Sequence, residues 1–136
     1  MVYMETSALA KRYLSEAESA QVDSIVERSS PEIYTSRITY AEVLSLLARS
    51  LRDRRFSPRD YEHQKRRFRQ EWDGFHIVEV TAECLLPAER LVERHPLRGL
   101  DAVQLCSALL LGRRDFARFD SRLNAAARAE DPPVIP

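Results

Sequence analysis

Residues 1–9 read Met1-Val-Tyr-Met-Glu-Thr-Ser-Ala-Leu9, a short apolar segment followed by an acid, two hydroxyl side chains and the start of a helical pattern. The apolar residues 2–4 predict a buried strand. Glu5 follows this strand directly, and Thr6 or Ser7 can cap the helix that comes next. Open α/β folds bind their ligands at the carboxyl ends of parallel strands. This segment therefore predicts a carboxylate at the ligand-binding edge of a sheet.

The length of 136 residues is that of one domain, which we expect to span residues 1–136. An apolar fraction of 44% and a charged fraction of 31% are typical of soluble globular proteins. No apolar run reaches the roughly 18 residues of a membrane helix, and the first residues lack the pattern of a signal peptide. We therefore expect a cytoplasmic protein without a membrane contact. Cys84 and Cys106 have no cysteine or histidine at zinc-site spacing and are interpreted as buried thiols.

The formal net charge of zero conceals an uneven distribution of charge. Of the 21 basic residues, 19 are arginines. Residues 49–69 carry nine basic and three acidic side chains, a local charge of +6, and residues 113–128 carry a local charge of +3. Such clusters are compatible with a phosphate-rich partner. The alternative interpretation is a solvated, charged helix face.

Strand and helix patterns alternate along the sequence. The predicted strands cover residues 2–4, 33–35, 76–80, 116–119 and 134–135. The predicted helices cover residues 8–14, 16–28, 40–51, 60–72, 82–93, 100–111 and 121–128. Thr39 and Thr81 are expected N-caps, and Pro87 interrupts the helical pattern of residues 82–93. The alternation predicts an α/β fold, with a parallel sheet that helices cover on both faces.

Most acids of the chain lie on faces that are already rich in charge, but four do not. Glu5 and Asp120 each follow a short strand and precede a helix, whereas Glu42 and Asp101 each lie alone near the start of an apolar helix. An isolated carboxylate in apolar surroundings is costly unless a partner neutralises it. That partner can be an arginine, a set of backbone N–H groups, or a hard cation such as Mg²⁺ or Mn²⁺. For Asp101 and Asp120, a simple helix-capping or first-turn role is the alternative.

The segments around these acids resemble the four acidic motifs of PIN-domain ribonucleases, and most closely those of the VapC toxins of prokaryotic toxin–antitoxin pairs. The segments occur in the family order and span nearly the whole chain. They read Met4-Glu5-Thr6-Ser7-Ala8-Leu9, Tyr40-Ala41-Glu42-Val43, Leu97-Arg98-Gly99-Leu100-Asp101-Ala102-Val103-Gln104-Leu105 and Phe116-Ala117-Arg118-Phe119-Asp120-Ser121-Arg122-Leu123. Each motif alone is weak evidence for this family, but four motifs in the family order are fairly specific for it.

The resemblance implies a three-layer α/β/α sandwich around a parallel, roughly five-stranded sheet. It also implies a pocket where the four catalytic acids meet, with Glu5, Asp101 and Asp120 as ligands of Mg²⁺ or Mn²⁺. Thr6 or Ser7 would support this pocket by hydrogen bonding. The reaction would be metal-dependent hydrolysis of an RNA phosphodiester, because a bound metal activates water and neutralises developing charge on the phosphate.

The resemblance further implies how the protein meets its partners. Arg98, Arg118 and Arg122 would hold the RNA backbone, or they would instead pair with the acids. A VapB-type antitoxin protein would cover the pocket, and the toxin would form a homodimer. These protein partners would bind to the apolar surface of the first four predicted helices.

Two positions depart from the family pattern. Glu5 stands where the first motif usually has Asp, and Arg118 stands where the last motif often has Ser or Thr. Both changes affect metal binding. Mg²⁺ demands strict ligand geometry, which the longer side chain of Glu5 alters, and Arg118 competes with a metal for the carboxylates. A PIN-like domain that binds RNA or antitoxin without catalysis is therefore one alternative. A receiver-type signalling domain is another, but it needs a lysine at a strand end, and neither Lys11 nor Lys65 lies there.

Overall fold

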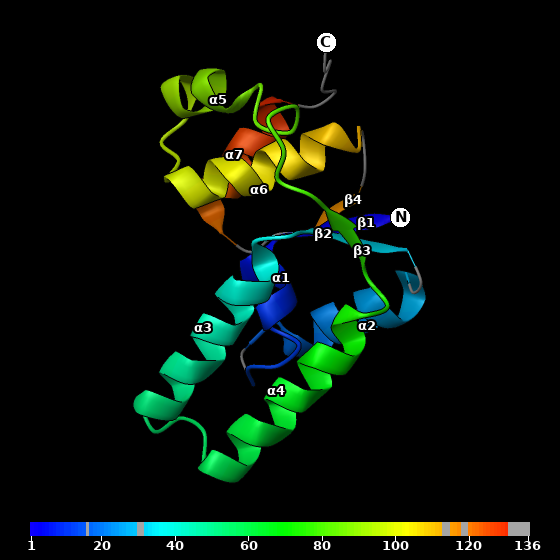
Figure 1. Cartoon of the computed structure of the whole chain (residues 1–136), viewed down its shortest axis with the longest axis vertical. Helices are drawn as coiled ribbons and strands as arrows, with labels where there is room; N and C mark the ends of the chain where they lie inside the picture. The colour runs from blue at the N-terminus through cyan, green and yellow to red at the C-terminus, as the bar shows by residue number, and fades with distance from the viewer. Residues whose placement is uncertain (16, 30–31, 113–114, 118–119, 131–136) are drawn as a thin grey trace.

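The computed structural model describes residues 1–15, 17–29, 32–112, 115–117 and 120–130. Its elements alternate along the chain as the sequence predicts (Figure 1). They are β1 (Val2–Met4), α1 (Thr6–Ala10), α2 (Ser19–Ser29), β2 (Ile33–Ser36), α3 (Thr39–Arg52), α4 (Pro58–Trp72), β3 (His76–Val78), α5 (Ala88–Arg94), α6 (Gly99–Leu110), β4 (Asp115–Ala117) and α7 (Ser121–Ala129). No helix among the described residues is both long and apolar enough to cross a membrane.

The four described strands form one parallel sheet in the order β3-β2-β1-β4. The strand β1 lies in the interior of the sheet, with Val2 paired to Ile33 of β2 and to Asp115 of β4. Because all strands run the same way, their carboxyl ends meet at one edge, and the segment after β1 is placed at its middle. The predicted fifth strand, residues 134–135, lies outside the described residues.

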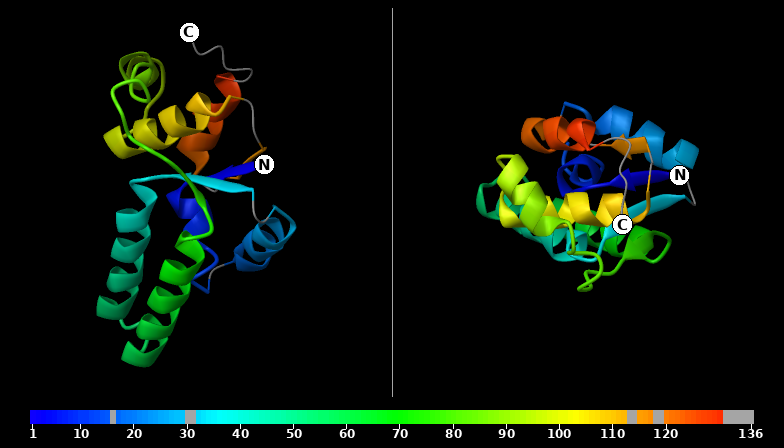
Figure 2. Two further views of the ribbon diagram at one scale, coloured as in Figure 1. Left: turned by 45° about the vertical axis from the view of Figure 1, so that its right-hand side comes forward. Right: turned by 90° about the horizontal axis from the view of Figure 1, so that it is seen from above.

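Helices cover both faces of the sheet, which gives the predicted three-layer α/β/α arrangement (Figures 1 and 2). The alternation of side chains along β1 separates the two cores. Val2 and Met4 pack on the side of α1–α4, whereas Tyr3 packs on the side of α5–α7. Residues of a strand alternate between its faces, so a three-residue strand supplies apolar side chains to two cores.

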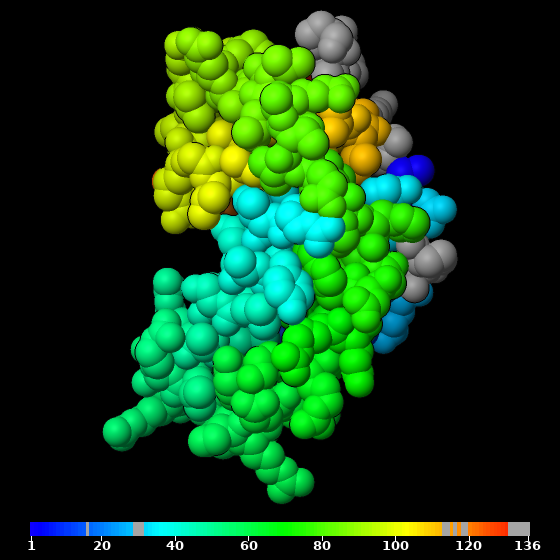
Figure 3. Space-filling model, viewed as in Figure 1, coloured from blue at the N-terminus to red at the C-terminus, as the bar shows by residue number. Residues whose placement is uncertain are grey.

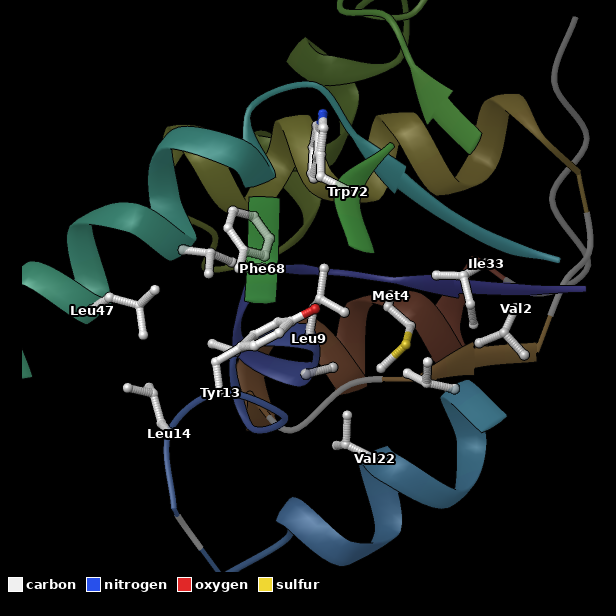
Figure 4. Packing of buried hydrophobic residues seen from close by; sticks show 14 residues of the cluster. Val2, Met4, Leu9, Tyr13, Leu14, Val22, Ile33, Leu47, Phe68 and Trp72 are labelled. Carbon is white, nitrogen blue, oxygen red and sulfur yellow. The ribbon is translucent and has the colours of Figure 1, made fainter. Parts of the chain in front are cut away.

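The core on the side of α1–α4 is rich in aromatic side chains (Figure 4). The rings of Tyr13 and Phe68 meet edge to face at 5.2 Å, and Trp72 lies beside Phe68 and Tyr40. Phe68 and Trp72 are buried, and Tyr61 packs against the cluster. The aromatic side chains of α4 therefore serve to pack this helix against the rest of the core.

The core on the side of α5–α7 is built mainly around α6, whose apolar residues contact α5, α7 and the sheet. Cys84 and Cys106 are both buried in it as free thiols, as the sequence predicts. Burial raises the pKa of the Cys106 thiol to about 11, so this group stays protonated at neutral pH.

The helices α3 and α4 form a hairpin that projects beyond the sheet (Figures 1 and 2). The Ser57 hydroxyl accepts a hydrogen bond from the Asp60 N–H at 3.1 Å, and Pro58 occupies the first turn of α4. Both features are common at helix starts, because proline lacks the N–H that would remain unpaired there.

Several predicted helix boundaries are wrong. Residues 82–87 form turns, and α5 begins only at Ala88, because Pro87 disfavours helical backbone in the residue before it. Thr81 accepts a hydrogen bond from the Cys84 N–H at 3.1 Å and so stabilises a turn instead of a helix. Thr39 is the first residue of α3 and not its N-cap, and its hydroxyl serves a buried network described below. The first helix ends at Ala10 and not at residue 14.

Candidate active site

A cavity of about 430 Å³ opens at the carboxyl edge of the sheet. Figure 3 shows the hollow in the molecular surface between the start of α6 and α3. Residues of the helices α1, α3 and α6, together with the N-cap residues of α1, α6 and α7, line it: Glu5, Thr6, Ser7, Ala41, Glu42, Ser45, Leu46, Arg49, Arg98, Leu100, Asp101, Gln104 and Asp120. All four acids singled out from the sequence are therefore brought to one cavity, although they are far apart along the chain.

Each of the four acids lies at the start of a helix. Glu5 and Asp120 are the N-caps of α1 and α7, and Glu42 and Asp101 lie in the first turns of α3 and α6. Helix N-termini carry unpaired N–H groups and partial positive charge. Four helix starts directed at one cavity stabilise its carboxylates and would equally favour a phosphate group.

Glu5 itself caps α1, so the prediction that Thr6 or Ser7 caps this helix is wrong. Its carboxylate accepts hydrogen bonds from the N–H of Ser7 at 2.9 Å and of Ala8 at 2.8 Å, and from the Ser7 hydroxyl. Ser7 thus supports the acid and not the helix. The residue Glu5 is only 4% exposed, and this burial raises the pKa of its carboxyl, with a smaller contribution from the negative charge of Asp120.

Glu42 is held by a network of side chains. One of its oxygens, Oε1, accepts hydrogen bonds from the Thr6 hydroxyl at 2.5 Å and from the Gln104 amide at 3.0 Å. The amide of Gln104 also donates to the hydroxyls of Thr6 and Thr39, both at 2.9 Å, and its carbonyl accepts from the Tyr3 hydroxyl at 2.5 Å. Gln104 therefore connects the strand β1, the helix α3 and the helix α6 beneath the cavity.

Sequence reasoning missed Gln104 as a site residue. Two signals pointed to it: it is a polar amide within the apolar segment 100–111, and it lies three residues after Asp101, hence on the same helix face. A buried polar side chain needs partners, and one beside a predicted site acid is a candidate for holding that acid in place.

The two remaining acids are held in different ways. Asp101 pairs with Arg98, which donates through its backbone N–H at 3.2 Å and its guanidinium at 3.0 Å. Asp120 accepts hydrogen bonds at Oδ1 from the N–H groups of Arg122 and Leu123, as expected of an N-cap.

The three arginines predicted to bind RNA have different positions. Arg98 lines the cavity but pairs with an acid, which is the alternative role that the sequence left open. Its side chain is 67% exposed, so this ion pair is readily exchanged with solvent or a ligand. The side chain of Arg122 does not line the cavity, and Arg118 lies outside the described residues. Arg49, which was not predicted as a site residue, does line the cavity.

A comparison with protein-family models matches residues 2–129 to the PIN domain. The chain belongs to the PIN-domain family. Its curated relatives include "Ribonuclease VapC45" and "Ribonuclease VapC49" of Mycobacterium tuberculosis, from the strains CDC 1551 / Oshkosh and ATCC 25618 / H37Rv. Each is 31% identical to this PIN domain over 138 residues, an alignment that covers 100% of the chain and 95% of the relative.

Solved structures share the PIN fold. The crystal structure of VapC20 from Mycobacterium tuberculosis, titled a Sarcin-Ricin loop cleaving toxin, matches with a TM-score of 0.70 and 20% identity over 93% of this chain and 95% of that one. A toxin–antitoxin complex from Klebsiella pneumoniae matches with a TM-score of 0.63 and 21% identity over 85% and 83%. The described four-stranded sheet and its two helical layers are therefore those of this fold.

The donor set of this PIN domain suits a hard divalent cation, because four carboxylates supply oxygen ligands and the cavity contains no sulfur or imidazole among its described lining residues. Within the described residues, however, no three acidic, histidine or cysteine side chains form a compact group of metal ligands. Each acid is held by protein hydrogen-bond donors instead. Within the described part of the chain, Oε2 of Glu42 and Oδ2 of Asp120 accept no hydrogen bond that would compete with a ligand.

Proposed function

We propose that this protein is a divalent-metal-dependent endoribonuclease that hydrolyses RNA phosphodiester bonds, acting as the toxin of a VapBC-type toxin–antitoxin pair. The observation that carries the proposal is the convergence of Glu5, Glu42, Asp101 and Asp120 on one cavity. The names of the full-length relatives, both VapC ribonucleases, support the reaction and its class. The toxin–antitoxin complex that shares the fold supports an antitoxin protein as partner.

In this proposal, Glu5, Asp101 and Asp120 hold Mg²⁺ or Mn²⁺. The bound cation would lower the pKa of a water molecule and offset the negative charge that develops on the phosphate. Glu42, kept in place by Thr6 and Gln104, has one oxygen available to accept a hydrogen bond from the attacking water. Arg49 and Arg98 at the cavity supply guanidinium groups for the phosphate oxygens of the RNA.

To bind RNA, Arg98 must exchange its partner Asp101 for a phosphate group. Its guanidinium pairs with Asp101, and it also lies within the electrostatic influence of Asp120 and Glu42, all of which raise the pKa of Arg98. If Asp101 helped to hold a metal, the Arg98 guanidinium would lose this partner and could bind an RNA phosphate instead. The proposal is completed by the antitoxin partner, by a homodimer, which the resemblance to VapC toxins implies, and by a cytoplasmic location, which the sequence predicts.

The test is the cleavage of a fluorescent RNA by the purified, antitoxin-free protein in Mg²⁺, in Mn²⁺ and in EDTA. Asp101→Asn serves as the site variant. Glu89→Gln is its matched control, because Glu89 is also an acid in the first turn of a helix but does not line the cavity. We expect metal-dependent cleavage by the wild type and the control and its loss in Asp101→Asn. Cleavage that persists in EDTA, or equally in Asp101→Asn, would refute the proposal.

A weakened nuclease is the second candidate, and the hydrogen bonding of Glu5 favours it. Both oxygens of this carboxylate are bound at the start of α1, which reduces their freedom to bind a metal. Glu5→Asp shortens the side chain by one methylene and tests this point. Increased cleavage in Glu5→Asp would identify the wild type as attenuated, whereas reduced cleavage would show that the site is built for glutamate.

A further inference from the structure

One face of α3 runs from the cavity to the tip of the α3–α4 hairpin. The residues of α3 that line the cavity follow helical spacing: Ala41, Glu42, Ser45, Leu46 and Arg49. The next position on the same face, three residues after Arg49, is Arg52. The helix therefore extends the cavity wall as a basic surface, at 1.5 Å per residue, toward the end of the hairpin. Figure 3 shows side chains that protrude from this tip into solvent.

We define the basic stripe as four exposed arginines: Arg49 and Arg52 on α3, and Arg54 and Arg55 in the turn that follows it. Among the described residues, none of the four forms an ion pair with an acid. Arg12, Arg37 and Arg90, by contrast, each contact a carboxylate. With Asp53 as the one acid between them, residues 49–55 carry a net charge of +3. Within the described part of the chain, the stripe is thus a group of cations without protein counter-ions next to the site.

The backbone at Arg54 adds a second observation. Its φ is +59°, in the left-handed region that favours glycine. The helix α3 ends there in a Schellman motif: the Arg55 N–H donates to the Ser50 carbonyl at 2.8 Å, and the Arg54 N–H donates to the Leu51 carbonyl at 3.1 Å. Arginine therefore occupies the position at which such helix ends most often have glycine. The local backbone does not account for the presence of this side chain.

We infer that the stripe binds the phosphate backbone of the RNA strand as it leaves the cavity along α3. This inference rests on the proposed function and names the route of its substrate. Arginine suits the task, because its guanidinium stays charged and binds phosphate oxygens through paired N–H groups. Phosphate contacts of this kind set the position of a nucleic acid without reading its bases. The other explanation is that Arg49 and Arg52 only complement the negative end of the α3 dipole, and the experiment separates the two.

The experiment measures equilibrium binding of a single-stranded fluorescent RNA over a series of salt concentrations. All proteins carry Asp101→Asn so that the RNA stays intact. The stripe variant is Arg52→Gln with Arg54→Gly, and the control is Arg66→Gln with Arg69→Gln. The control removes the same charge from exposed arginines of α4 that do not line the cavity and have no ion pair with a described residue.

We expect weaker RNA binding by the stripe variant and a salt slope reduced by about 0.7 for each phosphate group that is no longer bound. The control pair should keep the slope of the parent. Arg54→Gly relieves an unfavourable backbone conformation, so the melting temperature should stay the same or rise, and weaker binding cannot then be attributed to unfolding.

Equal salt slopes for the stripe variant and the control would overturn the inference. Unchanged RNA binding combined with weaker antitoxin binding would also overturn it, and would assign the stripe to the protein partner. These outcomes leave the proposed function standing if the wild type still cleaves RNA. Failure of the wild type both to cleave and to bind RNA would instead refute the proposed function itself.

Discussion

The most buried of the four cavity acids, Glu5, is also the one with the most local hydrogen bonds. Burial raises the pKa of its carboxyl, while the Ser7 and Ala8 donors act in the opposite direction. Burial has the larger effect, so the ionised form of Glu5 is less favourable in the folded protein than in the unfolded chain.

This shift predicts a pH dependence of folding stability. A raised pKa in the folded state means that the folded protein binds more protons than the unfolded chain between the ordinary glutamate value of 4.5 and the raised value. The contribution of Glu5 to stability is therefore greatest at low pH and is lost as the pH rises through the folded-state pKa. In Glu5→Gln this dependence should disappear, which urea unfolding at a series of pH values would show.

The comparison uses the change with pH and not the absolute stability, because the new amide group of glutamine changes the hydrogen bonding at the start of α1. Parallel stability curves for the wild type and Glu5→Gln would contradict the assigned titration of Glu5.

Gln104 offers a second prediction at the scale of single residues. Gln104→Leu removes the amide donor from Glu42 and leaves the buried hydroxyls of Tyr3 and Thr39 with fewer partners. We expect a loss of about 1–3 kcal/mol in unfolding free energy. RNA cleavage should fall on the order of 10-fold to 100-fold, because a displaced Glu42 no longer lies where the reaction needs it.

Tyr3→Phe is the matched control for Gln104→Leu. It removes the hydrogen bond that the Tyr3 hydroxyl donates to the Gln104 side-chain carbonyl. The hydrogen bond from the Gln104 amide to Glu42 is kept. It should therefore reduce stability with a much smaller effect on kcat. If both variants lose cleavage in proportion to their loss of stability, Gln104 has a purely structural role.

Among the elements, α1, α2 and α4 are joined by one arginine. Arg12 follows α1 and donates to Glu71 of α4 at 2.6 Å and to Asp23 of α2 at 2.8 Å. Its side chain is only 10% exposed. This ion-pair network fixes the turn after α1 against both neighbouring helices, and so supports the short helix that Glu5 caps.

Arg12→Met should therefore lower the free energy of unfolding by about 2 kcal/mol, since two partly buried carboxylates lose a charged partner. Chemical denaturation measures this loss. Arg66→Met is the control, because Arg66 is an exposed arginine of α4 that has no ion pair with a described residue, and it should change stability by less than about 0.5 kcal/mol. Equal losses in the two variants would show that the network adds no stability.

For the molecule as a whole, the proposed metal site predicts that folding stability depends on metal. A cation that binds only the folded protein stabilises it by about 2.7 kcal/mol at a concentration 100 times its Kd. Mg²⁺ or Mn²⁺ should therefore raise the melting temperature of the wild type and of Glu89→Gln by several degrees, and EDTA should reverse the change. Asp101→Asn should show little response, whereas an undiminished response would place the cation outside the cavity.

Features that depend on neighbouring residues were predictable from the sequence. The strand at residues 2–4, the apolar helix around residues 100–111 and the four acids at element starts follow from local periodicity and from the order of residue types. Boundaries were less predictable where a single residue changes the backbone. Pro87 delays the start of α5, and Glu5 caps α1 through a side chain long enough to fold back onto its own helix.

The sequence by itself determined the class of the fold, because alternating strands and helices permit few arrangements. Its resemblance to the PIN-domain motifs implied which acids belong together. Only the tertiary structure decided how those acids are held. The donation from Gln104 to Glu42, the pairing of Arg98 with Asp101 and the entry of Arg49 into the cavity depend on how α3 and α6 pack around β1. The network at Glu42 joins residues distant in the chain, so no local pattern specifies it.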